Sequence, residues 1–165
     1  DEVKEWVQPR SGSAHLNRVF TSLAGLKAEG SNDHAVAWDT LAGGLPGRCL
    51  VVFLSDFLEA EDELPERLRF AMSARYECLC LQTLDPDEFD LPNAEALRFS
   101  EMEGSKEIST SPPAIREEYS AGMDGFLERL KANLASVYAE FESLSTDAPL
   151  GPALHRFLGM RYSSL

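Results

Sequence analysis

The sequence predicts an α/β fold with three layers, in which a parallel sheet carries helices on both faces. The strongest observation is the run of six apolar residues at 49–54, which follows a chain-breaking Gly-Gly-Leu-Pro-Gly segment. Such a run, rich in β-branched and aromatic residues, is typical of a strand covered on both sides. Strand-like runs also alternate with helix-like segments along the chain, which is the pattern of layered α/β folds. We therefore expect 49–54 to be a central strand, parallel to a strand at 76–82.

Composition and charge limit the class of protein. The chain has 165 residues, of which 44% are hydrophobic and 26% charged, and we expect one domain over residues 1–165. The net charge of −13 argues against nucleic acid as a partner, because phosphate binding needs clustered Lys and Arg. No apolar run approaches the ~20 residues that would span a bilayer, so we expect no membrane insertion. The odd count of three Cys indicates reduced thiols in the cytoplasm.

The first part of the chain favours a strand followed by two helices. Residues 2–7 alternate imperfectly, as an edge strand does, before Pro9 stops them. Ser11 or Ser13 is placed to cap a helix with one buried apolar stripe, formed by Leu16, Val19, Phe20, Leu23 and Leu26. A second helix is expected after the loop at 30–33, ending at Gly43.

The rest of the chain favours alternating helices and strands. An acidic run at 59–63 precedes a helix whose first turn holds Pro65. We expect a strand at 76–82 and then an acidic loop at 84–92. A strand at 95–99 should follow, with a hairpin turn at Glu103-Gly104 that leads into a strand at 106–109. The chain should end with a long helix from Ser111, a strand at 139–144 and a final helix capped by Thr146 or Asp147.

Several short motifs resemble one known family. They are Gln-Pro-Arg-Ser-Gly at 8–12, Val-Val-Phe-Leu-Ser-Asp-Phe at 51–57, Leu-Gln-Thr-Leu-Asp-Pro-Asp-Glu at 81–88, and Ser-Thr-Asp-Ala-Pro-Leu at 145–150. In this order, with Ala-Leu-His-Arg-Phe-Leu at 153–158, the chain resembles the bacterial family of unknown function numbered fifty-eight. Its members carry a von Willebrand factor A-like domain and are often encoded beside MoxR-type AAA+ ATPases. The resemblance implies a Rossmann-like sheet and, in some members, a metal-ion-dependent adhesion site.

The chain departs from the metal-site pattern of that family. The pattern uses an Asp-x-Ser-x-Ser loop, a Thr from a second loop and an Asp after the central strand. No Asp-x-Ser-x-Ser occurs here, so we expect the chain to be the C-terminal part of the domain, without its first strands. The Thr loop corresponds to residues 30–33, which lack Thr, and only Asp56 matches cleanly. Asp56 and Ser31 are therefore candidate ligands for Mg²⁺ or Mn²⁺ in the full-length protein. The alternative is that both simply cap turns or helices.

Other polar clusters allow a functional and a purely structural interpretation. Asp85 and Glu88 would extend a cation site or, more simply, stabilise a turn. The acidic run at 59–63 would form a surface that binds a basic partner, or it would simply be the solvent-exposed start of a helix. Cys78 and Cys80 share a strand face, but a zinc site needs further ligands, so buried thiols are the simpler interpretation.

The leading hypothesis is a non-enzymatic interaction module, with no catalytic residues, whose partner is a MoxR-type ATPase or that ATPase's client. The alternative is a metal-dependent hydrolase that uses Asp56 with Asp85 or Glu88, although no nucleophile–base pair is evident. If the first strands are absent, residues 49–54 carry an open sheet edge. An open edge is a template for pairing, so we expect a homodimer or a swapped chain.

Overall fold

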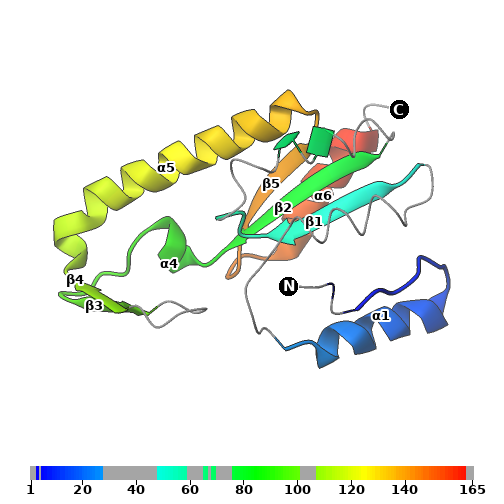
Figure 1. The fold of residues 1–165 in the computed structure, drawn as a ribbon, viewed down its shortest axis with the longest axis horizontal. Coiled ribbons are helices and arrows are strands. Elements are labelled where there is room, and N and C mark those ends of the chain that lie inside the picture. Colours follow the sequence, from blue (N-terminus) through cyan, green and yellow to red (C-terminus); the bar gives the residue numbers. More distant parts are fainter. Residues whose placement is uncertain are drawn as a thin grey trace.

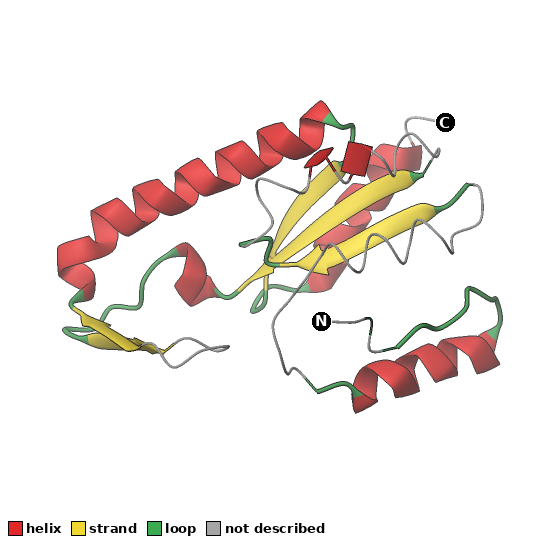
Figure 2. Cartoon of the chain, in the orientation of Figure 1, coloured by secondary structure: helices red, strands yellow, loops and turns green. Residues whose placement is uncertain are grey.

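A computed structural model describes residues 3, 5–27, 48–58, 65–66, 68–69, 76–100 and 107–162 of the chain (Figure 2). Its elements, labelled in Figure 1, are α1 (Ser13–Gly25), β1 (Leu50–Ser55), β2 (Glu77–Leu84), α4 (Pro86–Phe89), β3 (Leu97–Ser100), β4 (Glu107–Thr110), α5 (Pro112–Ser136), β5 (Glu140–Ser145) and α6 (Leu150–Tyr162). The alternation of strands and helices over the second half of the chain confirms the predicted mixed α/β class.

The main sheet has three parallel strands in the order β1-β2-β5. β1 pairs with β2 so that Val51 lies beside Cys78, and β2 pairs with β5 so that Thr83 lies beside Leu144. The parallel pairing of 49–54 with 76–82 is confirmed. Within the described sheet β2, and not 49–54, occupies the middle, and β1 ends the order of described strands, which is the arrangement expected if the first strands of the domain are absent. Apolar character marks a strand that can be buried, but it does not decide the strand order.

Helices lie on both faces of this sheet, as predicted. On one face, Val51, Cys78 and Cys80 pack in the main core with the C-terminal half of α5. On the other face, Leu79 and Leu81 form a smaller cluster with Leu144. α6 lies on this second face, because its Arg156 forms an ion pair with Glu142, which pairs with Leu81 in the sheet.

The second face is covered unevenly. Leu50, Val52 and Leu54 of β1 point to this face, and all three are exposed, Leu54 at 69%. Val51, which points to the α5 face, is buried. The same strand therefore has one packed side and one open apolar side among the described residues.

The cysteines belong to the core. Cys78 and Cys80 are buried, Cys49 is half-buried, and all three are free thiols. Burial raises the pKa of Cys78 to about 11 and that of Cys80 to about 12, and a neighbouring thiol adds to each shift. A thiol with a pKa so far above neutrality carries little of the reactive thiolate. The interpretation of Cys78 and Cys80 as buried thiols is confirmed.

The N-terminal part differs from the prediction in three ways. Residues 3 and 5–7 are not in a strand, so the predicted edge strand is absent from the described residues. The N-cap of α1 is Gly12, at φ 103°, and no side chain caps the helix. The stripe of α1 is not buried: Leu16, Phe20 and Leu23 are exposed. Helical periodicity defines an apolar face, but burial requires a partner element, and α1 holds no buried residue.

Some predicted elements lie outside the described residues. These are the helix after 30–33, the acidic run at 59–63 and the turn at Glu103-Gly104. The helix near Pro65 is described only at 65–66 and 68–69, where Leu68 is fully buried. The strands on either side of the turn, β3 and β4, do pair antiparallel in a separate two-stranded sheet, as predicted for a hairpin.

Candidate functional site

The carboxyl ends of β1, β2 and β5 meet at one edge of the sheet, because the three strands are parallel. In open α/β sheets this edge is where ligands bind. The first residues after the three strands are Asp56, Asp85 and Thr146. This edge is therefore the candidate site, and it contains two of the acidic residues that the sequence singles out.

Asp56 lies in a tight turn that its own side chain closes. Its Oδ1 accepts a hydrogen bond from the Leu58 backbone N–H at 3.1 Å. Ser55 Oγ accepts from the Phe57 N–H, also at 3.1 Å. Phe57 is buried at a positive φ of 60°, a conformation that costs a non-glycine residue roughly 1–3 kcal/mol. The contacts of Asp56 are those of a turn cap, which is the structural alternative to the metal ligand.

Gln82 joins all three strands beneath this edge. Its side chain is fully buried, with Nε2 donating to the Asp56 carbonyl at 2.8 Å and Oε1 accepting from Ser143 Oγ at 3.0 Å. Both ends of the amide are therefore satisfied, as burial of a polar group requires. Sequence reasoning missed this residue. The available signal is its position as a lone amide within the apolar run of β2.

Asp85 and Glu88 form a capping box at the start of α4. Asp85 Oδ1 accepts from the Asp87 N–H at 3.0 Å, and Glu88 Oε2 accepts from the Asp85 N–H at 2.6 Å. The second oxygen of Asp85 accepts from Thr146 Oγ1 at 3.2 Å. These contacts agree with the turn interpretation of this loop. They also link the ends of β2 and β5.

A metal centre is not assembled by the described residues. Within the described ranges, no three His, Cys, Asp or Glu side chains are grouped so that they could hold a metal ion. Ser31, the second predicted ligand, lies outside those ranges. Of the two predicted ligands the structure therefore describes Asp56 alone, and one oxygen of its carboxylate accepts from a backbone N–H. The proposed pairing of Asp56 with Ser31 stays a prediction.

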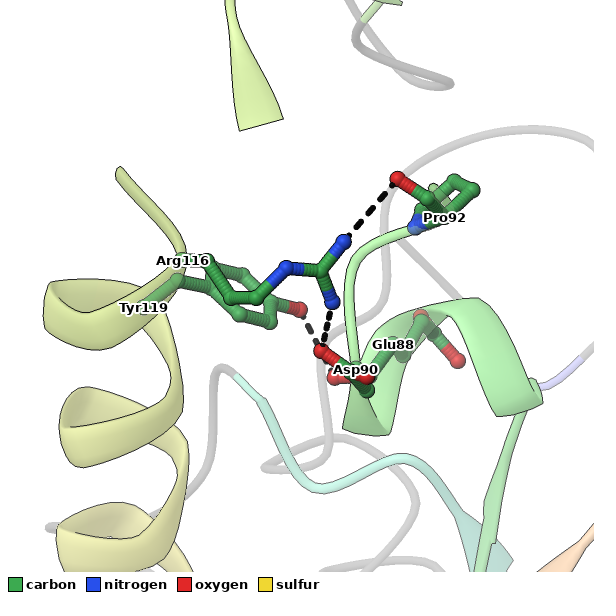
Figure 3. Close-up of polar contacts among 5 residues, drawn as sticks. All are labelled: Glu88, Asp90, Pro92, Arg116 and Tyr119. Carbon is green, nitrogen blue, oxygen red and sulfur yellow. Dashed lines mark hydrogen bonds and ion pairs between the residues drawn. The ribbon is translucent and has the colours of Figure 1, made fainter. Parts of the chain in front are cut away.

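A second polar cluster holds α4 against α5 (Figure 3). Arg116 forms an ion pair with Asp90 and donates to the Pro92 carbonyl at 3.3 Å. Tyr119 donates its hydroxyl hydrogen to the Glu88 carbonyl at 2.7 Å. Desolvation, with the Glu88 charge as a smaller cause, raises the pKa of Tyr119 above its usual value. Arg116 and Tyr119 are one helical turn apart, so both reach the same loop.

The hydropathy of the helices gives one further observation. Among the helices that the structure describes, none combines the length and the apolar character that crossing a membrane would require.

The fold and this edge define an α/β domain with a parallel sheet, whose acidic residues at the carboxyl edge make capping contacts. The chain belongs to the family described as protein of unknown function DUF58, whose model matches residues 1–125. The family predicted from the sequence motifs is thus confirmed.

Curated relatives cover almost the whole chain. The uncharacterized proteins Mb1516 of Mycobacterium bovis and Rv1480 of Mycobacterium tuberculosis are each 27% identical over 160 residues. The match covers 94% of this chain and 50% of each relative. The chain therefore spans about half the length of these relatives. No solved structure matches it.

Proposed function

We propose that this chain is a non-enzymatic protein-interaction module of von Willebrand factor A-like type. Its partner is a MoxR-type AAA+ ATPase or that ATPase's client, in assembly or maturation of the client. One observation carries this proposal: Leu50, Val52 and Leu54 leave an open apolar row along β1, the last described strand of the sheet order. Exposed apolar rows of this kind favour association with another protein. The family resemblance supplies the identity of the partner.

The hydrolase alternative has less support from the geometry. A general base or a metal ligand needs a carboxylate that is available to substrate or ion. Asp85 and Glu88 instead bind backbone N–H groups of their own turn, and Asp56 does the same at the end of β1. These contacts account for all three acidic residues without a reaction.

The partner proposal is tested with the purified full chain and a purified MoxR-type ATPase from the same organism. Leu54→Lys places a charge in the open apolar row, and Ala132→Lys places the same charge on the exposed side of α5. We expect the first variant to weaken ATPase binding by about tenfold, since buried apolar contacts dominate interfaces, and the second to bind as the original chain does. Surface-immobilised binding measurements give both affinities. Absence of binding by the unaltered chain contradicts the proposal.

A second copy of the chain is a further proposed partner. β1 ends the described sheet order, and the exposed side chains of Leu50, Val52 and Leu54 offer apolar surface to a second copy. At physiological salt the charge of −13 is screened beyond roughly 8 Å, so apolar burial is able to outweigh it. Sedimentation equilibrium at micromolar concentration should give a dimer, and Leu54→Lys a monomer. A monomer of 18.2 kDa for the unaltered chain would contradict this expectation.

Metal binding by Asp56 is proposed to be weak. Mg²⁺ and Mn²⁺ prefer several oxygen ligands, and the described residues supply one candidate. Titration calorimetry should show no tight binding of either ion. A dissociation constant in the low micromolar range that Asp56→Ala abolishes would mean that further ligands exist.

A further inference from the structure

We propose that the apolar face of the ribbon formed by β3 and β4 is a docking surface for a basic amphipathic helix of a partner protein. The proposal rests on the proposed function as an interaction module, and it adds a second surface, separate from the apolar row of β1, and the chemistry of the segment that binds there. The ribbon lies apart from the main sheet, at the N-terminal end of α5 (Figure 1).

The pairing register separates the ribbon into an apolar and a polar face. Phe99 pairs with Ile108, and Leu97 pairs with Thr110, so these four side chains share one face. The opposite face carries Arg98 and Ser109, with Arg98 forming an ion pair with Glu107 at 3.7 Å. Apolar and polar side chains therefore alternate along both strands, and the apolar ones point to the same face, as in strands that have one buried face and one solvated face.

Half of the apolar face is open in the described part of the chain, since Leu97 and Thr110 are half-buried while Phe99 and Ile108 are exposed. Phe99 is 40% exposed and Ile108 is 65% exposed, and neither belongs to a buried cluster of the described core. A lone two-stranded ribbon is marginal in water and gains stability when a helix packs on it. An exposed aromatic residue directly opposite an exposed β-branched residue is a suitable anchor for such a helix.

The segment of the sequence that contains the ribbon is acidic, which favours a basic partner. Residues 85–125 hold 11 acidic and 3 basic residues, which is a net charge of −8 out of −13 in a quarter of the chain. The two basic residues that the structure describes in this segment, Arg98 and Arg116, each already pair with a carboxylate. The segment that forms the ribbon therefore carries charge complementary to a cationic helix, which speeds encounter and selects against acidic partners.

The size of the face fits a short helix. Four-residue strands extend roughly 13 Å at about 3.3 Å per residue, and a helix covers that length in roughly nine residues at 1.5 Å each. Such a helix presents one stripe of three or four apolar residues at i, i+3 and i+4 spacing. Arg116 and Tyr119 hold the α4 loop to α5 beside the ribbon.

The test uses a synthetic peptide with a leucine stripe and lysines elsewhere, of sequence KLKKLLKKLLKKLK, and the full chain. A peptide with the same composition in scrambled order and a peptide with Glu in place of Lys are the controls. Fluorescence anisotropy should show binding of the first peptide, weaker binding of the scrambled peptide by about tenfold or more, and none of the acidic one. Raising the salt should weaken binding, since part of it is electrostatic.

Two neighbouring substitutions locate the surface. Ile108→Lys places a charge on the apolar face, and Ser109→Lys places the same charge on the opposite face of the same strand. We expect Ile108→Lys to weaken peptide binding by about tenfold and Ser109→Lys to leave it almost unchanged. Ile108→Thr keeps the β-branched shape, and it should weaken binding with an unaltered thermal melt. Equal binding by Ile108→Lys and Ser109→Lys, or equal binding of the ordered and scrambled peptides, would overturn the proposal.

The same variants separate this inference from the proposed function. If the MoxR-type ATPase binds the unaltered chain and Ile108→Lys equally well, the ribbon is not the docking surface, while the proposed function stands. If the ordered peptide binds through Ile108 and the ATPase does not bind at all, the ribbon is a docking surface and the proposed partner is wrong.

Discussion

The two halves of α5 make different kinds of contact, although they form one continuous helix. The C-terminal half buries Phe126, Leu130 and Leu134 against the main sheet, in the large core cluster. The N-terminal half buries only Pro112 and instead uses Arg116 and Tyr119 to hold the α4 loop through polar contacts. Apolar burial therefore stabilises one end of the helix, and hydrogen bonds position an exposed, acidic region at the other. The difference predicts that mutations affect stability in one half and local order in the other.

The largest effect should come from the core half. Leu130→Ala removes a fully buried side chain from the cluster, and such changes cost roughly 2–5 kcal/mol through lost burial and the cavity left behind. Ile115→Ala, in the half-buried N-terminal half, should cost about 1 kcal/mol. Urea unfolding of both variants measures the free energies. Similar losses for the two positions would remove the contrast between the halves.

A smaller loss is expected beneath the carboxyl edge. Gln82→Ala leaves the Asp56 carbonyl and the Ser143 hydroxyl without their described partner. Each lost hydrogen bond of this part-buried kind costs about 1 kcal/mol, so we expect a total loss of about 2 kcal/mol. Thr83→Ala, the next residue on β2 and exposed, is the matched control and should cost about 0.5 kcal/mol or less. Equal costs would mean that the Gln82 amide does not tie the strands together.

The polar half should respond locally. Tyr119→Phe removes only the hydroxyl that donates to the Glu88 carbonyl, worth about 1 kcal/mol. We expect faster amide exchange in residues 86–92, with the core amides of β2 unchanged. Tyr138→Phe, at a residue 86% exposed, is the control and should change neither. Faster exchange throughout the sheet would indicate that the loop contact supports the whole fold.

The smallest expected effect is a change with pH in the free energy of unfolding that the Tyr119 hydroxyl contributes. The pKa of Tyr119 is raised, so folding favours its neutral form. Its contribution is fully present below the ordinary tyrosine pKa of about 10 and is lost as pH rises through the raised folded value. The stability difference between the unaltered chain and Tyr119→Phe should therefore be constant from pH 7 to about 9. It should shrink at higher pH, as unfolding at several pH values can measure. A difference that stays constant above that range would exclude the hydroxyl as its source.

The spacing of residues close in the sequence was sufficient to predict much of the fold. The spacing of apolar residues and Pro112 at the start predict the long helix, which the structure confirms over Pro112–Ser136. The apolar run within 76–82 predicts β2, the short strand predicted at 139–144 is confirmed as β5, and the Asp85-Pro86 pair predicts the turn that the capping box forms. These features depend on contacts between residues close in sequence, or on a chain that alternates regularly, so they can be read without knowing the tertiary structure.

Long-range contacts decided the rest. Residues 49–54 are the most apolar run, yet β2 takes the middle of the sheet, because strand order depends on which strands pair and not on the composition of one strand. The α1 stripe has a helical period and no buried residue, because burial needs a partner surface. Gln82 joins residues 26 and 61 positions away. Sequence determined the local elements of this protein, and only the tertiary structure decided which faces are covered and which polar groups meet, since those depend on segments that periodicity does not connect.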